Sequence, residues 1–243
     1  MTDTERGRGA YDLPLERPLD LLREVYDGTI RRRLPRVLGV YNGVVTRRYY
    51  LLDLTQSTNE PAYKQALVEG VREAIDPGDA VVEIGAGFGV CTVWAAREAG
   101  AEGRVLSFEA NAEQTRVVRE ALELTGQVAG EDLLDRVDVQ QALVGSDLET
   151  YGSMAGAARV EPAALPDCDV LTMDCEGAEL DVLRELSVEP RTIVVETHPT
   201  HGAPTDAVVE VLSSKGYAIE TTPVTTKEGG SKDVVTATKS SDT

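Results

Sequence analysis

Residues 81–89 read VVEIGAGFG, an apolar run interrupted only by Glu83 that leads into three glycines at alternate positions. The run has the length of a buried strand, and the residues after Gly89 continue with a helical pattern. The glycines let backbone and ligand approach closely, because any Cβ there would collide. The amides that open the following helix face the ligand. This strand, glycine loop and helix predict a doubly wound α/β domain that binds a ligand at the loop.

The pattern outward from this loop is that of a mostly parallel sheet, because short apolar runs alternate with helical stretches from about residue 60 onward. The expected strands are residues 80–84, 104–108, 137–140, 170–173 and 192–196. The expected helices are residues 60–75, 89–98, 112–124, 178–186 and 204–215. Residues 217–221 and 234–238 are strand-like with no helix between them, so they should pair antiparallel.

The predicted fold class is therefore α/β: a doubly wound, mostly parallel, seven-stranded Rossmann-like sheet with a C-terminal antiparallel hairpin. Residues 59–243 should form this ligand-binding domain. Residues 1–58 precede the sheet and are expected to be an appended segment, partly helical, that could cover the mouth of the site.

The loop indicates a nucleoside ligand without a phosphate. Its G-x-G-x-G spacing departs from the dinucleotide fingerprint at Val90, and Glu83 ahead of the loop would repel a phosphate. Glu109 lies at the end of the second expected strand, where an acid accepts hydrogen bonds from ribose hydroxyls. Small and apolar residues after the third strand could sandwich an adenine. The predicted ligand-binding residues are Glu83, Gly85, Ala86, Gly87, Phe88, Gly89, Glu109, Ala110, Gln141 and Ala142.

Two further segments resemble a named family. Residues 171–179, LTMDCEGAE, resemble the D-x-E-G-x-E signature of FkbM-family methyltransferases, and residues 194–198, VVETH, resemble the E-x-H ending of that family's fifth strand. Thr172 is a departure, because many members carry lysine there. The resemblance covers about residues 60–200. It implies S-adenosylmethionine as cofactor and methyl transfer to a hydroxyl oxygen of a small-molecule, saccharide or lipid-like acceptor, with Asp174 beside the cofactor's transferring methyl.

Methyl transfer to a hydroxyl requires positioning of the acceptor and removal of its proton. The catalytic candidates are His198, Asp174 and Glu176, all expected with Glu196 at the carboxyl ends of central strands. His198 is the best base by intrinsic pKa, and the alternative is a loop histidine ahead of Pro199. Glu179 is assigned to the dipole of the helix that it opens.

Two other functions are compatible with the sequence, and a third is disfavoured by it. An RNA methyltransferase would use the arginines near residues 31–36 but lacks an appended RNA-binding domain. A non-catalytic nucleoside-binding module is also compatible with the sequence. A nicotinamide oxidoreductase is disfavoured by Val90. The oligomeric state and the acceptor are not determined by the sequence.

Composition and charge restrict the partners, metal sites and cellular compartment that we expect for this chain. The chain has 42 acidic and 24 basic residues, a formal net charge of −18, which disfavours nucleic acid as a partner. No 18-residue apolar run is present, so no membrane span is expected. The three cysteines lack zinc-site spacing, so we expect no metal and reduced thiols in a cytoplasmic protein. The cluster Arg31–Arg36, with Arg47 and Arg48, is interpreted either as a recognition site for an anionic acceptor group or as a solvated helix end paired with acids.

The acidic, lysine-poor surface is typical of a salt-adapted protein, the alternative being an ordinary acidic enzyme. We expect the melting temperature to rise from low salt to about 1 M KCl, because salt screens repulsion among the excess negative charges. A melting temperature that stays level or falls would remove the halophilic interpretation.

Overall fold

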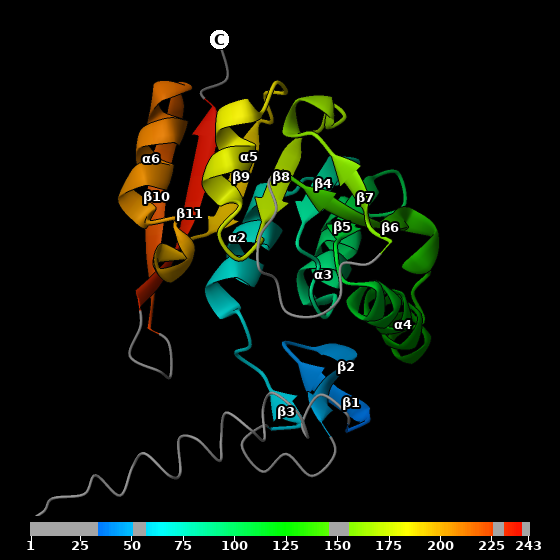
Figure 1. Cartoon of the computed structure of the whole chain (residues 1–243). Helices are drawn as coiled ribbons and strands as arrows, with labels where there is room; N and C mark the ends of the chain where they lie inside the picture. The colour runs from blue at the N-terminus through cyan, green and yellow to red at the C-terminus, as the bar shows by residue number, and fades with distance from the viewer. Residues whose placement is uncertain (1–33, 51–56, 146–155, 226–230, 240–243) are drawn as a thin grey trace, which may run out of the picture.

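The computed structural model describes residues 34–50, 57–145, 156–225 and 231–239. Its main element is an eight-stranded sheet with the order β10-β11-β9-β8-β4-β5-β6-β7 (Figure 1). The strands are β4 (Ala80–Ile84), β5 (Arg104–Glu109), β6 (Val137–Val144), β7 (Ala158–Val160), β8 (Val170–Met173), β9 (Thr192–Glu196), β10 (Tyr217–Thr225) and β11 (Ser231–Lys239). β11 pairs antiparallel with β10, as predicted, and also with β9; the other pairings of this sheet are parallel. The predicted α/β fold is confirmed, and β7 adds a short edge strand that the sequence did not indicate.

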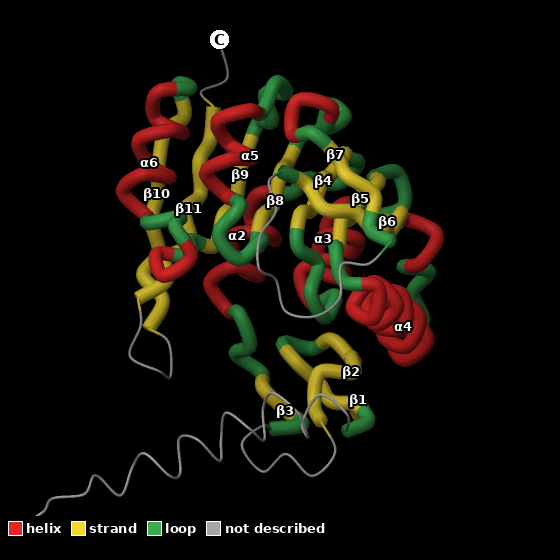
Figure 2. Tube along the Cα trace, in the orientation of Figure 1, coloured by secondary structure: helices red, strands yellow, loops and turns green. Residues whose placement is uncertain are grey.

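Helices cover both faces of this sheet (Figure 2). They are α2 (Gln65–Ala74), α3 (Val90–Ala99), α4 (Ala112–Ala129), α5 (Glu179–Glu185) and α6 (Thr205–Ser214), with short 3-10 turns η3 (Leu134–Arg136), η4 (Pro162–Ala164) and η5 (Pro199–His201). The helices α2, α3 and α4 share one buried apolar cluster, and α5 and α6 share the cluster on the other face. The two clusters explain why the central strands are apolar on both sides. No helix in the described ranges is both long and apolar enough to cross a membrane.

A second, small sheet lies at the edge of the main sheet where the parallel strands end (Figure 1). It consists of β1 (Arg36–Tyr41), β2 (Val44–Tyr50) and β3 (Asn59–Glu60). Asn42 and Gly43, both with positive φ, form the two-residue turn between β1 and β2. Tyr41 and Val44 are fully buried in the same cluster as α2 and α3. The described part of the appended segment is therefore extended and shares the core of the main domain; residues 1–33, where helix was also expected, lie outside the described residues.

The close approach of β4 and β8 just beyond their ends fixes the geometry of the site. Gly85 follows β4 with a φ of +88°, and a Cβ there would lie 2.2 Å from the carbonyl oxygen of Asp174. The amide of Asp174 donates to the carbonyl of Ile84 at 2.9 Å. Only glycine fits at position 85, because a side chain would push the two chain segments apart.

We expect Gly85→Ala to destabilise the fold by about 3 kcal/mol or more, because it adds a backbone clash to the left-handed conformation. Gly78→Ala is the matched control: its φ is +97°, but a Cβ would meet nothing within 4 Å. It should cost only about 1 kcal/mol. Urea unfolding of both variants measures the difference, and equal losses would contradict the close contact.

Candidate functional site

The glycine loop connects β4 to α3. Gly85, Gly87 and Gly89 all have positive φ, and Gly89 is the N-cap of α3. A Cβ on Gly89 would lie 3.2 Å from atoms of Val118 and Ala121 in α4, so this glycine permits close packing of α4 on the loop. The loop lies at the carboxyl edge of the sheet, where the amide of Gly85 donates to the carbonyl of Phe108 and the amide of Gly87 to the carboxylate of Glu109.

Glu83 lies beneath this loop rather than on its surface. Its side chain is 2% exposed, and its Oε2 accepts hydrogen bonds from the hydroxyls of Thr92 at 2.6 Å and Ser107 at 2.5 Å. Burial raises the pKa of Glu83, and the two hydroxyls oppose that shift. The carboxylate therefore ties α3 and β5 to β4 and supports the loop from below.

Glu109 joins the loop to the end of β5. Its Oε2 accepts a hydrogen bond from the amide of Gly87, and its Oε1 from the amide of Asn111, both at 2.8 Å. Burial raises the pKa of Glu109, while these amides lower it. Gln141 of β6 lies beside the end of β5, because its Nε2 donates a hydrogen bond to the carbonyl of Ala110 at 3.4 Å. The predicted ligand residues of β4, β5 and β6 are thus brought to one edge.

Acidic side chains and one imidazole converge where β8 and β9 end. Nε2 of His198 lies 3.5 Å from Oδ1 of Asp174, 3.5 Å from Oε2 of Glu196 and 3.7 Å from Oε2 of Glu176. Glu176 adopts a left-handed φ of +54°. The structure therefore brings together the three residues predicted to be catalytic. We call Asp174, Glu176, Glu179, Glu196 and His198 the acid–imidazole cluster.

Glu179 fixes the imidazole of His198. Both side chains are fully buried, and Nδ1 of His198 lies 2.6 Å from Oε1 of Glu179. The sequence assigned Glu179 to the dipole of α5, of which it is the first residue; the structure adds that its carboxylate turns inward to the imidazole. Although burial lowers the pKa of His198, the neighbouring carboxylates, Glu179 first, raise it to about 9.

Lys64 supplies a cation that sequence reasoning missed. It is the left-handed N-cap residue of α2, and its Nζ contacts Oδ2 of Asp174 and lies 3.2 Å from Oε2 of Glu196. Lys232 of β11 reaches the same oxygen of Glu196 at 3.3 Å. Burial raises the pKa of Asp174 to about 7 despite Lys64, whereas Lys64, His198 and Lys232 hold the pKa of Glu196 below its usual range although it is buried. Only the folded chain reveals Lys64, which lies 110 residues from Asp174.

The small sheet packs on the glycine loop. The hydroxyl of Thr46 donates to the carbonyl of Phe88 at 2.7 Å, and the guanidinium of Arg36 lies 5.1 Å from the Phe88 ring centroid. The described arginines of this segment pair with acids: Arg36 with Glu113, Arg47 with Glu120 and Arg48 with Glu60. The pairing with acids agrees with one interpretation of the arginines, but the described ones lie on β1 and β2 and not at the expected helix end. Arg31, Arg32 and Arg33 lie outside the described residues.

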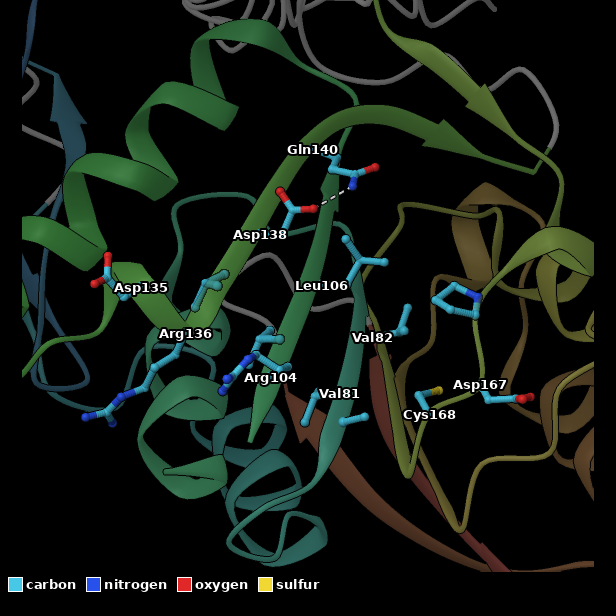
Figure 3. Close-up of a pocket in the computed structure, with 14 residues that line it drawn as sticks. Val81, Val82, Arg104, Leu106, Asp135, Arg136, Asp138, Gln140, Asp167 and Cys168 are labelled. Atoms are coloured by element: carbon cyan, nitrogen blue, oxygen red, sulfur yellow. Dashed lines mark hydrogen bonds between the residues drawn. The ribbon is translucent and has the colours of Figure 1, made fainter. Parts of the chain in front are cut away.

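A concavity of about 460 Å³ lies elsewhere on the sheet (Figure 3). It is lined by the first halves of β4, β5 and β6 and by residues 166–168, and within it Gln140 donates to Asp138 at 2.7 Å. The glycine loop and the acid–imidazole cluster lie beyond the opposite, carboxyl ends of these strands. This concavity is therefore separate from the predicted site.

The chain was compared with known proteins. Residues 160–219, which contain the whole acid–imidazole cluster, match the model of the methyltransferase FkbM domain. The search of curated proteins found no match. A solved S-adenosylmethionine-dependent O-methyltransferase from Thermotoga maritima is 14% identical, with a TM-score of 0.52 over 81% of this chain and 77% of that chain. This likeness shows a shared fold.

Two further solved structures are similar at lower scores. The precorrin-6y C5,15-methyltransferase from Geobacter metallireducens is 20% identical, with a TM-score of 0.49 over 74% of this chain and 89% of that one. An O-methyltransferase from Bacillus cereus in complex with S-adenosylhomocysteine is 16% identical, with a TM-score of 0.46 over 94% of each chain.

We expect Glu109→Ala to weaken S-adenosylhomocysteine binding by about 2 to 3 kcal/mol, because ribose hydroxyls would lose a charged acceptor. Glu102→Ala is the control: Glu102 is exposed and precedes the amino end of β5. Calorimetric titration measures both affinities, and circular dichroism checks the fold. Equal affinities would show that Glu109 serves only to hold the loop.

Proposed function

We propose that this S-adenosylmethionine-dependent methyltransferase methylates a hydroxyl oxygen of a small-molecule, saccharide or lipid-like acceptor. The enzyme class and the cofactor follow from the match to the FkbM methyltransferase domain on a Rossmann-like methyltransferase fold, and this match confirms the family resemblance. The proposal concerns the acceptor and the residues that act on it.

The glycine loop and Glu109 are assigned to the cofactor. Glu109 accepts two backbone amides, which leaves lone pairs on both oxygens for ribose hydroxyls. Ala110 follows the end of β5, and Gln141 and Ala142 lie in β6 level with that end, since Gln141 pairs with Glu109; these three residues are assigned to the adenine. The methionine part then extends along residues 83–89 toward Asp174, whose carbonyl contacts the Gly85 segment. A cofactor in this position directs its methyl group toward the acid–imidazole cluster.

One observation carries the choice of a hydroxyl acceptor: Asp174, Glu176 and His198 converge within hydrogen-bonding reach of one point beside the glycine loop. The sulfonium already activates the methyl group, so the enzyme must mainly position the nucleophile and exclude water. A hydroxyl becomes a good nucleophile only when its proton is taken, and carboxylates and imidazole do this. The cluster meets that need, whereas an amine acceptor would require less help.

The charge of the chain favours a small acceptor over RNA. A net charge of −18 opposes the phosphate contacts that supply most of the affinity for nucleic acids. The arginines of the described N-terminal strands are paired with glutamates, so they add little positive field at the site.

The acceptor class is tested with cofactor carrying a labelled methyl group. The enzyme is incubated separately with small-molecule extract, lipid and saccharide fractions, and total RNA. We expect the label in one of the first three as a methyl ether, which survives alkali. Alkali-labile label would indicate a carboxylate acceptor, and label retained on RNA would replace the proposal with RNA methylation.

A further inference from the structure

We infer that Asp174, Glu176 and His198 form a binding site for one divalent metal ion at the carboxyl ends of β8 and β9. The sequence led to the expectation of no metal, because its three cysteines lack zinc-site spacing; the ligands inferred here are instead two carboxylates and one imidazole from two separate strand ends. In the fold their ligand atoms all lie within 4.8 Å of one another.

The first argument for a metal site comes from the imidazole of His198. His198 is fully buried, and its Nε2 makes no hydrogen bond within the part of the chain that the structure describes. Its Nδ1 is engaged by the buried carboxylate of Glu179 at 2.6 Å. A histidine whose Nδ1–H is donated to a carboxylate directs the lone pair of Nε2 outward, which is how metal-bound histidines are oriented. Nε2 here faces carboxylate oxygens, and a bound cation between them would take the place of a proton on this nitrogen.

The second argument for a metal site comes from the carboxylate of Asp174. Lys64 contacts only its Oδ2, while Oδ1 is buried without a hydrogen bond among the described residues and lies 3.5 Å from Nε2 of His198. A buried carboxylate oxygen normally has a partner. Oδ1 of Asp174 and Nε2 of His198, neither of which has a hydrogen bond among the described residues, thus lie next to each other. Oε2 of Glu176 lies 3.7 Å from the same nitrogen.

The charge count agrees with a divalent ion. Four carboxylates and two lysines meet in this region, so the carboxylates exceed the lysines by two, and a divalent ion that displaces the proton from the imidazole would balance that excess. The carboxylates are Asp174, Glu176, Glu179 and Glu196, and the lysines are Lys64 and Lys232. Two oxygens and one imidazole nitrogen suit Mn²⁺ and similar ions better than Ca²⁺, which prefers oxygen ligands alone.

The role of the ion rests on the proposed function, whereas the site itself does not. A hydroxyl acceptor would coordinate the ion beside the cofactor's methyl group, and coordination lowers the pKa of the hydroxyl. The proton of the acceptor hydroxyl would pass to Oε1 of Glu176, the oxygen that does not bind the ion. The Glu176 side chain is 34% exposed and can release the proton to solvent. The oxygen then bonds to the methyl carbon as the carbon–sulfur bond breaks, and the sulfur keeps the electron pair. His198 would serve as ligand instead of base.

Binding of Mn²⁺ to the chelator-treated full chain tests the site without any acceptor or turnover. Calorimetry should show one saturable equivalent for the native protein. Glu176→Gln should weaken binding at least about tenfold. Glu102→Gln, which removes the same charge beyond the opposite edge of the sheet, should leave it unchanged. Equal affinities in the two variants, or no saturable binding to the native protein, would overturn the site.

A second measurement does not depend on any variant. Electron spin echo modulation of the bound Mn²⁺ should contain coupling to one imidazole nitrogen, and its absence would overturn the assignment of His198. Neither result requires the acceptor to be a hydroxyl. If labelled methyl instead appears on RNA while stoichiometric Mn²⁺ binding holds, the proposed function fails and the metal site stands.

Discussion

The contact between Gly85 and the carbonyl of Asp174 sets the geometry on which the rest of the site depends. It brings the end of β4 against the end of β8, with the amide of Asp174 bonded to Ile84 on one side and no space for a Cβ on the other. Because of this contact, the glycine loop and the acid–imidazole cluster lie on adjacent segments of one edge. The carboxyl ends of parallel strands lie along one edge of the sheet, which is why the residues predicted to bind the ligand gather there.

Burying so many ionisable groups has a cost that the surrounding structure must offset. Glu179 and His198 are both fully buried and pair through Oε1 and Nδ1, and Lys64 and Lys232 neutralise two of the carboxylates. Removing one partner of such a buried pair typically costs about 3 to 5 kcal/mol, because the other charge is left uncompensated. A fold that retains this arrangement at that cost holds it for a purpose other than stability, in keeping with a reacting centre.

The central strands could be predicted because their signals are local. Residues 80–84, 170–173 and 192–196 are predominantly apolar runs, and their predicted bounds coincide with β4, β8 and β9. The hairpin of β1 and β2 was missed although its Asn42-Gly43 turn is a strong local signal. β7 has only three residues and no pattern to identify it. Lys64 and the inward turn of Glu179 depend on contacts far apart in the sequence, which periodicity does not report.

The central claim is that the glycine loop and Glu109 hold a phosphate-free nucleoside cofactor against the acid–imidazole cluster. Thermal unfolding with S-adenosylhomocysteine or NAD tests it most directly. A ligand at about a hundred times its dissociation constant stabilises the fold by about 2.7 kcal/mol, which is a clear shift in melting temperature. We expect that shift with S-adenosylhomocysteine and none with NAD. A shift with NAD and none with the thioether would contradict the account.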